Sequence, residues 1–308
     1  MTNPSRYFLR LIVVIAGFGW MADNVNAQTA SAPAPQGPQA GQKVAFLGDS
    51  ITHFGMGAGG YVMLVSQAME KAGRKIVVIP AGIPGHTSKD MLARVKHDVI
   101  DQKPDWMTLS CGVNDVWHGP KGVPLDEYKT NITAIVDQVT AAGIKVVILT
   151  STMIMEDPNN DFNKKLADYN EFLRGLAKER HLPLADLNAD MQAELAKDKA
   201  EMPGLLGNIL TVDGVHMNGV GNEMMAAGVL KAFGMDDAQV AQIRGGWMDT
   251  PDTAPLDAKG KVSVRDYLAL QKAAAGQKTS VDTMLSADLD KDIKSHLASG
   301  SAATSEKP

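Results

Sequence analysis

Ser50 is the first residue of this sequence whose type and surroundings suggest chemistry. It follows the apolar run of residues 43–47 and Gly48, at a point where a buried strand is expected to turn into a helix. A serine at such a turn lies beside backbone N–H groups without helical partners, and a developing oxyanion requires donors of that kind. An acid followed by a serine after a strand is also an ordinary turn or helix cap. Ser50 is therefore a candidate nucleophile only if the chain supplies its partners.

The segment 213–216 supplies a candidate base and a partner for it. His216 carries an imidazole, whose ordinary pKa of about 6.5 suits proton transfer near neutrality. Asp213 lies three residues earlier, and a loop of that length can bring its carboxylate to Nδ1 of the histidine. The competing interpretation is an Asp-Gly turn followed by a histidine that caps the next helix. The catalytic interpretation makes Ser50 the nucleophile, His216 the base and Asp213 the residue that orients the base.

Two further segments offer donors for an oxyanion. Gly85 permits close approach of its backbone N–H, and the side-chain amide of Asn114 donates hydrogen bonds without carrying a charge. With the backbone N–H of Ser50 they would form an oxyanion hole. Taken singly, a turn glycine and a strand-to-helix cap are the better interpretations of Gly85 and Asn114. Together, four turns that hold Ser, Gly, Asn and Asp-x-x-His in this order favour catalysis over coincidence.

The candidate residues follow short apolar runs that alternate with amphipathic stretches. The runs predict five strands, at 43–47, 75–79, 105–111, 145–149 and, weakly, 182–185. Helices are expected near 59–72, 87–99, 126–142, 162–180 and 219–233. Continuous apolar runs are typical of strands buried on both faces, so the pattern predicts a parallel sheet covered by helices on both sides. Ligand sites of such sheets lie at the carboxyl ends of the strands, which is where the candidate residues fall.

Four blocks of the sequence resemble those of the SGNH (GDSL-type) hydrolases. They are Gly48-Asp49-Ser50-Ile51-Thr52, the segment 81–88 around Gly85, Gly112-Val113-Asn114-Asp115 and Asp213-Gly214-Val215-His216, and the resemblance covers residues 43–233 approximately. It implies a flavodoxin-like three-layer α/β/α sandwich with a five-stranded parallel sheet, no metal and no organic cofactor. It also implies the catalytic and oxyanion roles given above. His86 departs from the pattern, because many relatives have an acid after the glycine, and the polarity near the oxyanion hole is expected to differ.

Several other side chains are candidates for the surroundings of the site. Candidates for contact with substrate are Asp49, His53, His86, Trp117 and His118. Asp49 is also expected to hold the turn at the nucleophile, together with Thr87 and Asp115 in their own turns. Trp117 and His118 either line the pocket or lie in a surface loop. The remaining histidines lack ligand-like spacing, so we expect no metal site.

Composition limits the function classes. The chain has a net charge of −5 and 5% aromatic residues, and no long run of Lys or Arg appears in it. These values give no sign of a nucleic-acid surface, so we expect no nucleic-acid partner. Cys111 is the only cysteine, which excludes an internal disulfide. Its place at the end of an apolar run favours a buried, unreactive thiol over a catalytic one.

The two ends of the chain are predicted to lie outside the catalytic domain. Residues 1–27 carry basic, apolar and then small residues in order, which predicts a secretory signal peptide, with an uncleaved anchor as the alternative. The expected remainder is a flexible linker over 28–42, a hydrolase domain over 43–235 and a helical C-terminal extension over 236–308, with helices at 263–273 and 280–297. The mature protein is therefore expected in the periplasm or outside the cell, with no stable membrane insertion after cleavage.

These features predict a secreted serine esterase that hydrolyses carboxylic esters through an acyl-enzyme, with a small-molecule or glycan ester as its substrate. An exported location without an apolar lid favours a polar substrate, so a carbohydrate O-acetyl ester is the first hypothesis. A lysophospholipase, short-chain acyl esterase or thioesterase is the alternative within the family. A non-catalytic binding module on the same fold is the alternative of another class. It predicts loss of a nucleophile, base or oxyanion position, and Ser50, His216 and Asn114 are all present.

Overall fold

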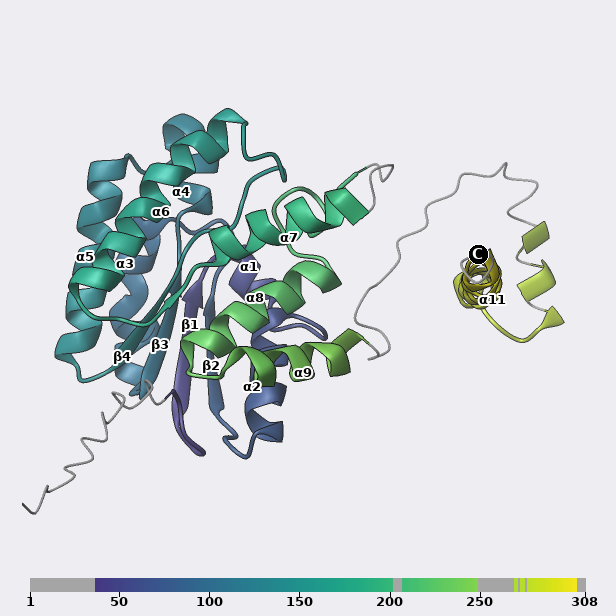
Figure 1. Cartoon of the computed structure of the whole chain (residues 1–308), viewed down its shortest axis with the longest axis horizontal. Coiled ribbons are helices and arrows are strands. Elements are labelled where there is room, and N and C mark those ends of the chain that lie inside the picture. Colours follow the sequence, from purple (N-terminus) through teal and green to yellow (C-terminus); the bar gives the residue numbers. More distant parts are fainter. Residues whose placement is uncertain (1–36, 202–206, 249–268, 271, 275, 304–308) are drawn as a thin grey trace, which may run out of the picture. The chain divides into compact units, whose positions relative to one another are not determined.

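A five-stranded parallel sheet forms the centre of the chain in the computed structural model, which describes residues 37–201, 207–248, 269–270, 272–274 and 276–303. Its strands are β1 Lys43–Gly48, β2 Val77–Gly82, β3 Trp106–Ser110, β4 Lys145–Leu149 and β5 Leu184–Ala185. They lie in the order β2-β1-β3-β4-β5, and every neighbouring pair is parallel (Figure 1). The predicted five-stranded parallel sheet is confirmed.

Burial differs between the centre and the edge of the sheet. β1, β3 and β4 are buried along nearly their whole length, as their continuous apolar runs predict. β2 is an edge strand: Val77 is 49% exposed, and Pro80, which has no N–H to donate, is tolerated where one side of a strand has no partner. The strand runs over 77–82 rather than the predicted 75–79, because it pairs in register with the whole of β1.

Helices cover both faces of the sheet (Figure 1). On one face, packed beside one another, are α3 Ser88–Asp98, α5 Leu125–Ala141 and α6 Asp161–Glu179. On the other are α2 Tyr61–Lys71, α7 Leu187–Glu201, α8 Gly219–Ala232 and α9 Asp237–Met248. The result is the predicted three-layer α/β/α arrangement, and the five predicted helices are found to within two residues at each end.

Two short helices follow the central strands: one begins at Ser50, where the sequence predicts a turn into a helix, and one contains Asn114, for which a strand-to-helix cap is an alternative interpretation. α1 Ser50–Phe54 comes directly after β1, and α4 Val113–Trp117 comes after β3. Helices of five residues are too short to show an apolar period. Their position matters because β1 and β3 are neighbours whose connections lead to opposite sides of the sheet, and the crevice at such a switch point is the usual ligand site of the fold. Single 3₁₀ turns lie at Ile100–Gln102 and Gly119–Lys121.

Two helices in the later part of the first unit, α7 and α9, were not predicted from the sequence. α7 and α9 are helices with little segregation of apolar residues to one face, so periodicity does not reveal them. α9 lies beyond the boundary predicted at residue 235, yet it packs on α8, and its Trp247 is 2% exposed. The chain falls into two compact units that divide between residues 254 and 255, and the second contains α11 Val281–Ala303, where a helix over 280–297 is expected.

The predicted signal peptide, residues 1–27, lies outside the described residues, as do most of the linker and most of the helix expected over 263–273. Within the part of the chain that is described, no helix has the length and apolar character needed to cross a bilayer. The domain boundaries at both ends therefore stay predictions.

Candidate active site

The β1–α1 turn presents Ser50 as the first residue of α1. Asp49 caps this helix, because its Oδ1 accepts a hydrogen bond of 2.9 Å from the backbone N–H of Ile51. Gly48 is required for the tight turn, since a Cβ there would lie 2.0 Å from Oγ1 of Thr52. The Ser50 side chain thus stands at the end of a buried strand while remaining partly exposed.

Ser50, His216 and Asp213 form a continuous chain of hydrogen bonds. Nε2 of His216 lies 2.8 Å from Oγ of Ser50, and Nδ1 of His216 lies 2.6 Å from Oδ2 of Asp213. The second carboxylate oxygen, Oδ1, accepts from the backbone N–H groups of Val215 and His216. Burial opposes ionisation of Asp213, but these hydrogen bonds outweigh it and hold the pKa of the carboxyl below its usual value. A carboxylate at Nδ1 fixes the tautomer whose Nε2 can accept a serine proton.

Glu156 holds the loop that carries the candidate base, and sequence reasoning misses it. Its buried carboxylate accepts hydrogen bonds from the backbone N–H groups of Ile209 and Leu210, at 2.7 and 2.9 Å. It also accepts from the hydroxyl of Thr211, which itself accepts from the backbone N–H of Gly214 at 3.1 Å. Gly214 has a φ of +95°, which favours glycine at this point. No local pattern marks Glu156, because its partners lie 53 to 55 residues away in the chain.

The three candidate oxyanion donors come from the ends of three neighbouring strands. Ser50 follows β1, Gly85 follows β2, and Asn114 lies on α4 after β3. Gly85 has a φ of +76°, in the left-handed region that favours glycine. Nδ2 of Asn114 donates to the backbone carbonyl of His86 at 3.1 Å and has a longer contact of 3.4 Å with Oδ2 of Asp49. One hydrogen of this amide is therefore anchored, and an oxyanion would compete only with the weaker contact.

Buried carboxylates lie next to these donors. Asp49 is 2% exposed, and its burial raises the pKa of the carboxyl to about 6, against the lowering effect of the hydrogen bond from Ile51. Burial also raises the pKa of Asp115, although Ser88 donates to it from its backbone N–H at 2.9 Å and from its hydroxyl at 2.6 Å. The burial of Asp49 favours the predicted role in holding the turn over direct contact with a substrate.

Cys111 belongs to the same buried region. It follows β3, is 3% exposed, and its thiol donates to Oδ2 of Asp115 at 3.5 Å. Its backbone carbonyl accepts from the hydroxyls of Tyr128 and Ser151, at 2.8 and 2.7 Å. Burial raises the pKa of the thiol well above its usual value, so the reactive thiolate is disfavoured. The prediction of a buried thiol is confirmed.

An exposed aromatic ring lies beside the candidate base. The Phe54 ring packs edge-to-face against the His216 imidazole with 5.2 Å between centroids, and His53 packs against Phe54 at 5.4 Å. Phe54 is 57% exposed. Sequence reasoning misses it because α1 is too short for its outward face to be read from periodicity. A ring beside the group that would protonate a leaving alcohol is a candidate contact for that alcohol.

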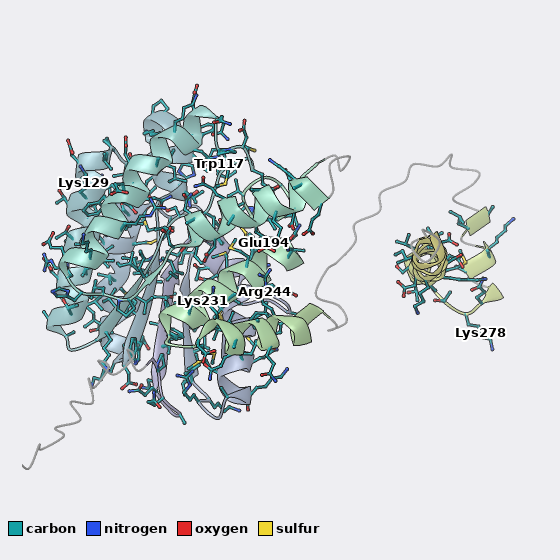
Figure 2. The ribbon with its side chains drawn as sticks, viewed as in Figure 1. Trp117, Lys129, Glu194, Lys231, Arg244 and Lys278 are labelled. Carbon is teal, nitrogen blue, oxygen red and sulfur yellow. The ribbon has the colours of Figure 1, made fainter. Side chains whose placement is uncertain are left out.

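The remaining predicted contact residues have varied surroundings. His86 is partly buried, and its Nδ1 accepts a hydrogen bond of 3.0 Å from Nε of Arg94. Trp117 ends α4 and packs against the core (Figure 2), whereas His118 is exposed at the end of the helix. Contact with substrate therefore stays a prediction for His86, Trp117 and His118, and also for His53.

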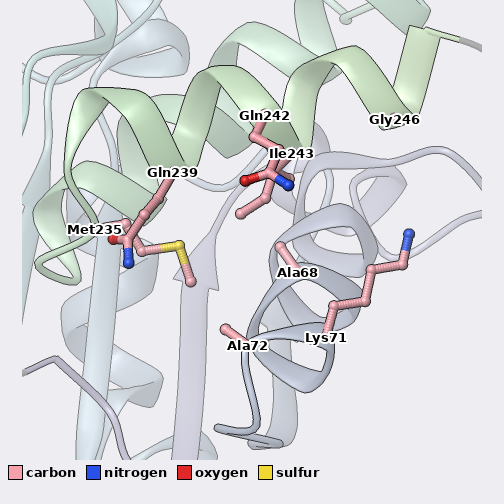
Figure 3. A pocket seen from close by; sticks show the side chains of 8 residues that line it. All are labelled: Ala68, Lys71, Ala72, Met235, Gln239, Gln242, Ile243 and Gly246. Carbon is pink, nitrogen blue, oxygen red and sulfur yellow. The ribbon is translucent and has the colours of Figure 1, made fainter.

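Two hollows elsewhere in the first unit carry no comparable arrangement. One of about 320 Å³ lies between α2 and α9 and is lined mainly by apolar and amide side chains, with Lys71 among them (Figure 3). A second of about 140 Å³ lies among α7, α8 and α9, where Arg244 pairs with Glu194 at 3.2 Å near Lys231 (Figure 2). Among the described residues, no group of three or more His, Cys, Asp or Glu side chains is placed to hold a metal ion.

A family model, described as the GDSL-like lipase/acylhydrolase family, matches residues 46–224. The match spans more than half of the chain and includes all four blocks. The chain belongs to this family. The predicted resemblance to the SGNH (GDSL-type) hydrolases is thereby confirmed.

The chain is similar to several esterases over the same region. It is 30% identical to an acetylxylan esterase of Geobacillus stearothermophilus, over 64% of this chain and 95% of that one. It is 25% identical to an isoamyl acetate-hydrolyzing esterase of Saccharomyces cerevisiae, over 62% of this chain and 86% of that one. The crystal structure of an acetyl xylan esterase, AlAXEase, matches with a TM-score of 0.58 and 34% identity, over 62% of this chain and 98% of that one.

Solved structures of the Geobacillus stearothermophilus enzyme include variants described as catalytic mutants, in which alanine replaces a serine, an aspartate or a histidine. Membership of the family and similarity to these enzymes make this chain an esterase of the carboxylic ester hydrolase class.

Proposed function

We propose that this protein is an exported serine esterase that removes acetyl groups from a carbohydrate. Ser50 is the nucleophile, His216 the base and Asp213 the residue that orients the base. The hydrogen-bond chain through these three side chains carries the proposal. The catalytic mutants described for the Geobacillus stearothermophilus enzyme support it, because they replace the same three residue types, and there too the aspartate precedes the histidine by three positions.

In the first half-reaction, Nε2 of His216 removes the hydroxyl proton as Oγ of Ser50 attacks the ester carbonyl carbon. Negative charge develops on the former carbonyl oxygen, which would accept from the backbone N–H groups of Ser50 and Gly85 and from Nδ2 of Asn114. The imidazolium is stabilised by the Asp213 carboxylate. His216 then returns the proton to the leaving alkoxide, and the alcohol departs from an acetyl-enzyme.

In the second half-reaction, water replaces the alcohol. Nε2 of His216 removes a proton from the water as its oxygen attacks the acetyl carbonyl, and the same donors stabilise the second oxyanion. Collapse of this intermediate breaks its bond to Oγ of Ser50, which takes the proton back from His216, and releases acetic acid, which ionises to acetate in solution. The chain's own residues supply every proton transfer in this scheme.

Three observations support an acetylated carbohydrate as the substrate. Two of the compared proteins are named as acetylxylan esterases, and the third is named for hydrolysis of another acetate ester. Phe54 offers an exposed ring beside His216, on the side from which the alcohol leaves, and such a ring can pack against the C–H face of a sugar. The alternative remains a lysophospholipase, short-chain acyl esterase or thioesterase.

The serine mechanism is tested by covalent labelling. A fluorophosphonate probe is expected to modify Ser50, identified by peptide mass spectrometry, and Ser50→Ala is expected to abolish hydrolysis of 4-nitrophenyl acetate. Ser66→Ala, a substitution on α2, serves as the matched control and should retain both labelling and activity. Absence of labelling in a folded sample would favour the non-catalytic binding module.

The substrate class is tested by two panels. In a series of 4-nitrophenyl esters of increasing chain length, kcat/KM should be highest for acetate, and acetate should be released from acetylated xylooligosaccharides. A maximum at medium or long chains would overturn the acetyl proposal in favour of a lipid ester. Faster hydrolysis of an acyl thioester than of its oxygen ester would favour the thioesterase.

Export is tested by expressing the full chain in bacteria and determining the N-terminus of the product in each cell fraction. The mature protein is expected to begin near Gln28 and to be recovered from the periplasm or the medium. An intact N-terminus in the membrane fraction would establish the uncleaved anchor instead.

A further inference from the structure

Arg94 of α3 directs its guanidinium at the carboxyl ends of two strands. Its side chain is 11% exposed. Nη2 donates to the carbonyl of Gly48 at the end of β1, and Nη1 donates to the carbonyl of Ala81 in β2, each at 2.9 Å. Nε donates to Nδ1 of His86 at 3.0 Å. The charge is balanced by Asp98, one helical turn along α3, at 2.9 Å from Nη1.

Arg94 bonds directly to the segments that lead to two of the proposed oxyanion donors, and the third donor is linked to it through His86. Gly48 lies two residues before Ser50, and His86 directly follows Gly85. The backbone carbonyl of His86 accepts the hydrogen bond from Nδ2 of Asn114. One guanidinium therefore bonds to the segments that carry Ser50 and Gly85, and the Asn114 side chain is tied to the same turn through the His86 carbonyl.

The shape of the side chain suits this task. A guanidinium is planar and presents five N–H donors at fixed angles, so that it can hold several acceptors in one arrangement. A lysine ammonium is a single nitrogen on a flexible stem and cannot reproduce the fork. Because the guanidinium is almost fully buried and each of its three nitrogens donates to a protein acceptor, Arg94 acts on the fold around the site rather than on a substrate.

We propose that Arg94 is a positioning residue for the oxyanion hole. It fixes the ends of β1 and β2 and the turn at Gly85 relative to one another, so that donors from three segments converge before a substrate binds. The inference rests on the proposed function, because it assumes that Ser50, Gly85 and Asn114 donate to an oxyanion. Misplacement of a catalytic group by about 1 Å can lower a rate about 100-fold, so loss of the fork is expected to lower kcat while KM is retained.

Arg94→Lys and Arg94→Met test the proposal. With 4-nitrophenyl acetate, kcat should fall by about 10- to 100-fold and KM should stay within about twofold. Inhibition by a trifluoromethyl ketone, which forms an oxyanion on the serine, should weaken by a similar factor. Arg174→Lys is the matched control, because Arg174 makes a comparable fork with Asp186 at 2.8 and 2.9 Å that involves none of the candidate catalytic residues. It should lower the melting temperature and leave kcat unchanged.

A folded Arg94→Lys protein with wild-type kcat and ketone affinity would show the proposal to be wrong. If the Arg94 variants do not fold, His86→Phe decides, because it removes the Nδ1 acceptor at a partly exposed position. A lower kcat at unchanged KM would support the proposal, and a higher KM at unchanged kcat would overturn it. Failure of the proposed function is separately visible, since the wild-type protein would then show no labelling of Ser50, and the inference would fall with it.

Discussion

The two sides of the proposed site are built differently. The donor side, which consists of the segments with Ser50, Gly85 and Asn114, stands on the ends of three adjacent strands, and its capping carboxylate Asp49 is 2% exposed. The base loop, residues 207–218, is held largely by one distant carboxylate, and the side chain of Asp213 within it is 49% exposed.

Because of this difference, substitutions on the two sides are expected to affect activity and stability to different degrees. On the donor side, two of the three proposed oxyanion donors are backbone N–H groups, whose positions depend on buried packing. On the base loop, the proposed catalytic groups are partly exposed side chains, so a substitution there is expected to remove the activity while the fold keeps its stability. The predictions below measure that separation, and they run from the largest expected effect to the smallest.

Asp213→Asn is expected to lower kcat by about 10⁴-fold, because an amide at Nδ1 stabilises the wrong tautomer of His216 and cannot balance an imidazolium. The melting temperature should change little, since the carboxylate is half exposed. Steady-state kinetics and thermal unfolding of the same sample measure both. Asp161→Asn, at an almost fully exposed position, is the control. A large loss of stability in Asp213→Asn would contradict the separation of the two sides.

Asn114→Ala is expected to lower kcat by about 10²- to 10³-fold with little change in KM, because it removes one donor to the developing oxyanion. The side chain is buried and bonded to the carbonyl of His86, so stability should fall as well. Kinetics with 4-nitrophenyl acetate and chemical denaturation provide the two numbers. An unchanged kcat would remove Asn114 from the oxyanion hole.

Asp49 is expected to make stability depend on pH. Its pKa rises from 3.8 to about 6 in the fold, so the native state binds more protons than the unfolded state between these values. The free energy of unfolding should therefore decrease as the pH rises, by about 2 kcal/mol between about pH 4 and about pH 6 and by about 3 kcal/mol over the whole range for this rise in pKa. Urea unfolding at several pH values, compared with Asp49→Asn, isolates this contribution. An equal slope in wild type and variant would contradict it.

Glu156→Gln is expected to cost about 1–3 kcal/mol of stability, because an amide group replaces one of the oxygens that accept from the base loop. The catalytic loss should be smaller than for Asp213→Asn, since the loop loses an anchor and the three proposed catalytic side chains remain. Chemical denaturation measures the loss of stability and steady-state kinetics measure the loss of kcat, with Glu179→Gln at an exposed position as the control. A loss of kcat as large as that of Asp213→Asn would assign Glu156 a direct chemical role.

The sequence predicted the features that depend on residues close together in the chain and missed those that depend on contacts between distant residues. The central strands were predictable because they are continuous apolar runs. The candidate nucleophile and donors were predictable because they follow strands closely, and the base because it lies three residues after Asp213. For α1 and α4 only the start of a helix could be expected, because five residues carry no apolar period from which the bounds could be read. Glu156 and Arg94 were missed, since each acts through partners that only the fold brings near.

The buried thiol of Cys111 has a practical consequence. A thiol reagent cannot reach a side chain that is 3% exposed and hydrogen-bonded to Asp115 unless the carboxyl edge of β3 opens. As the chain has no other cysteine, the labelling rate under native conditions reports the frequency of that opening without any engineered probe. Comparing this rate with and without a bound inhibitor would show how strongly occupation of the crevice rigidifies the sheet below it.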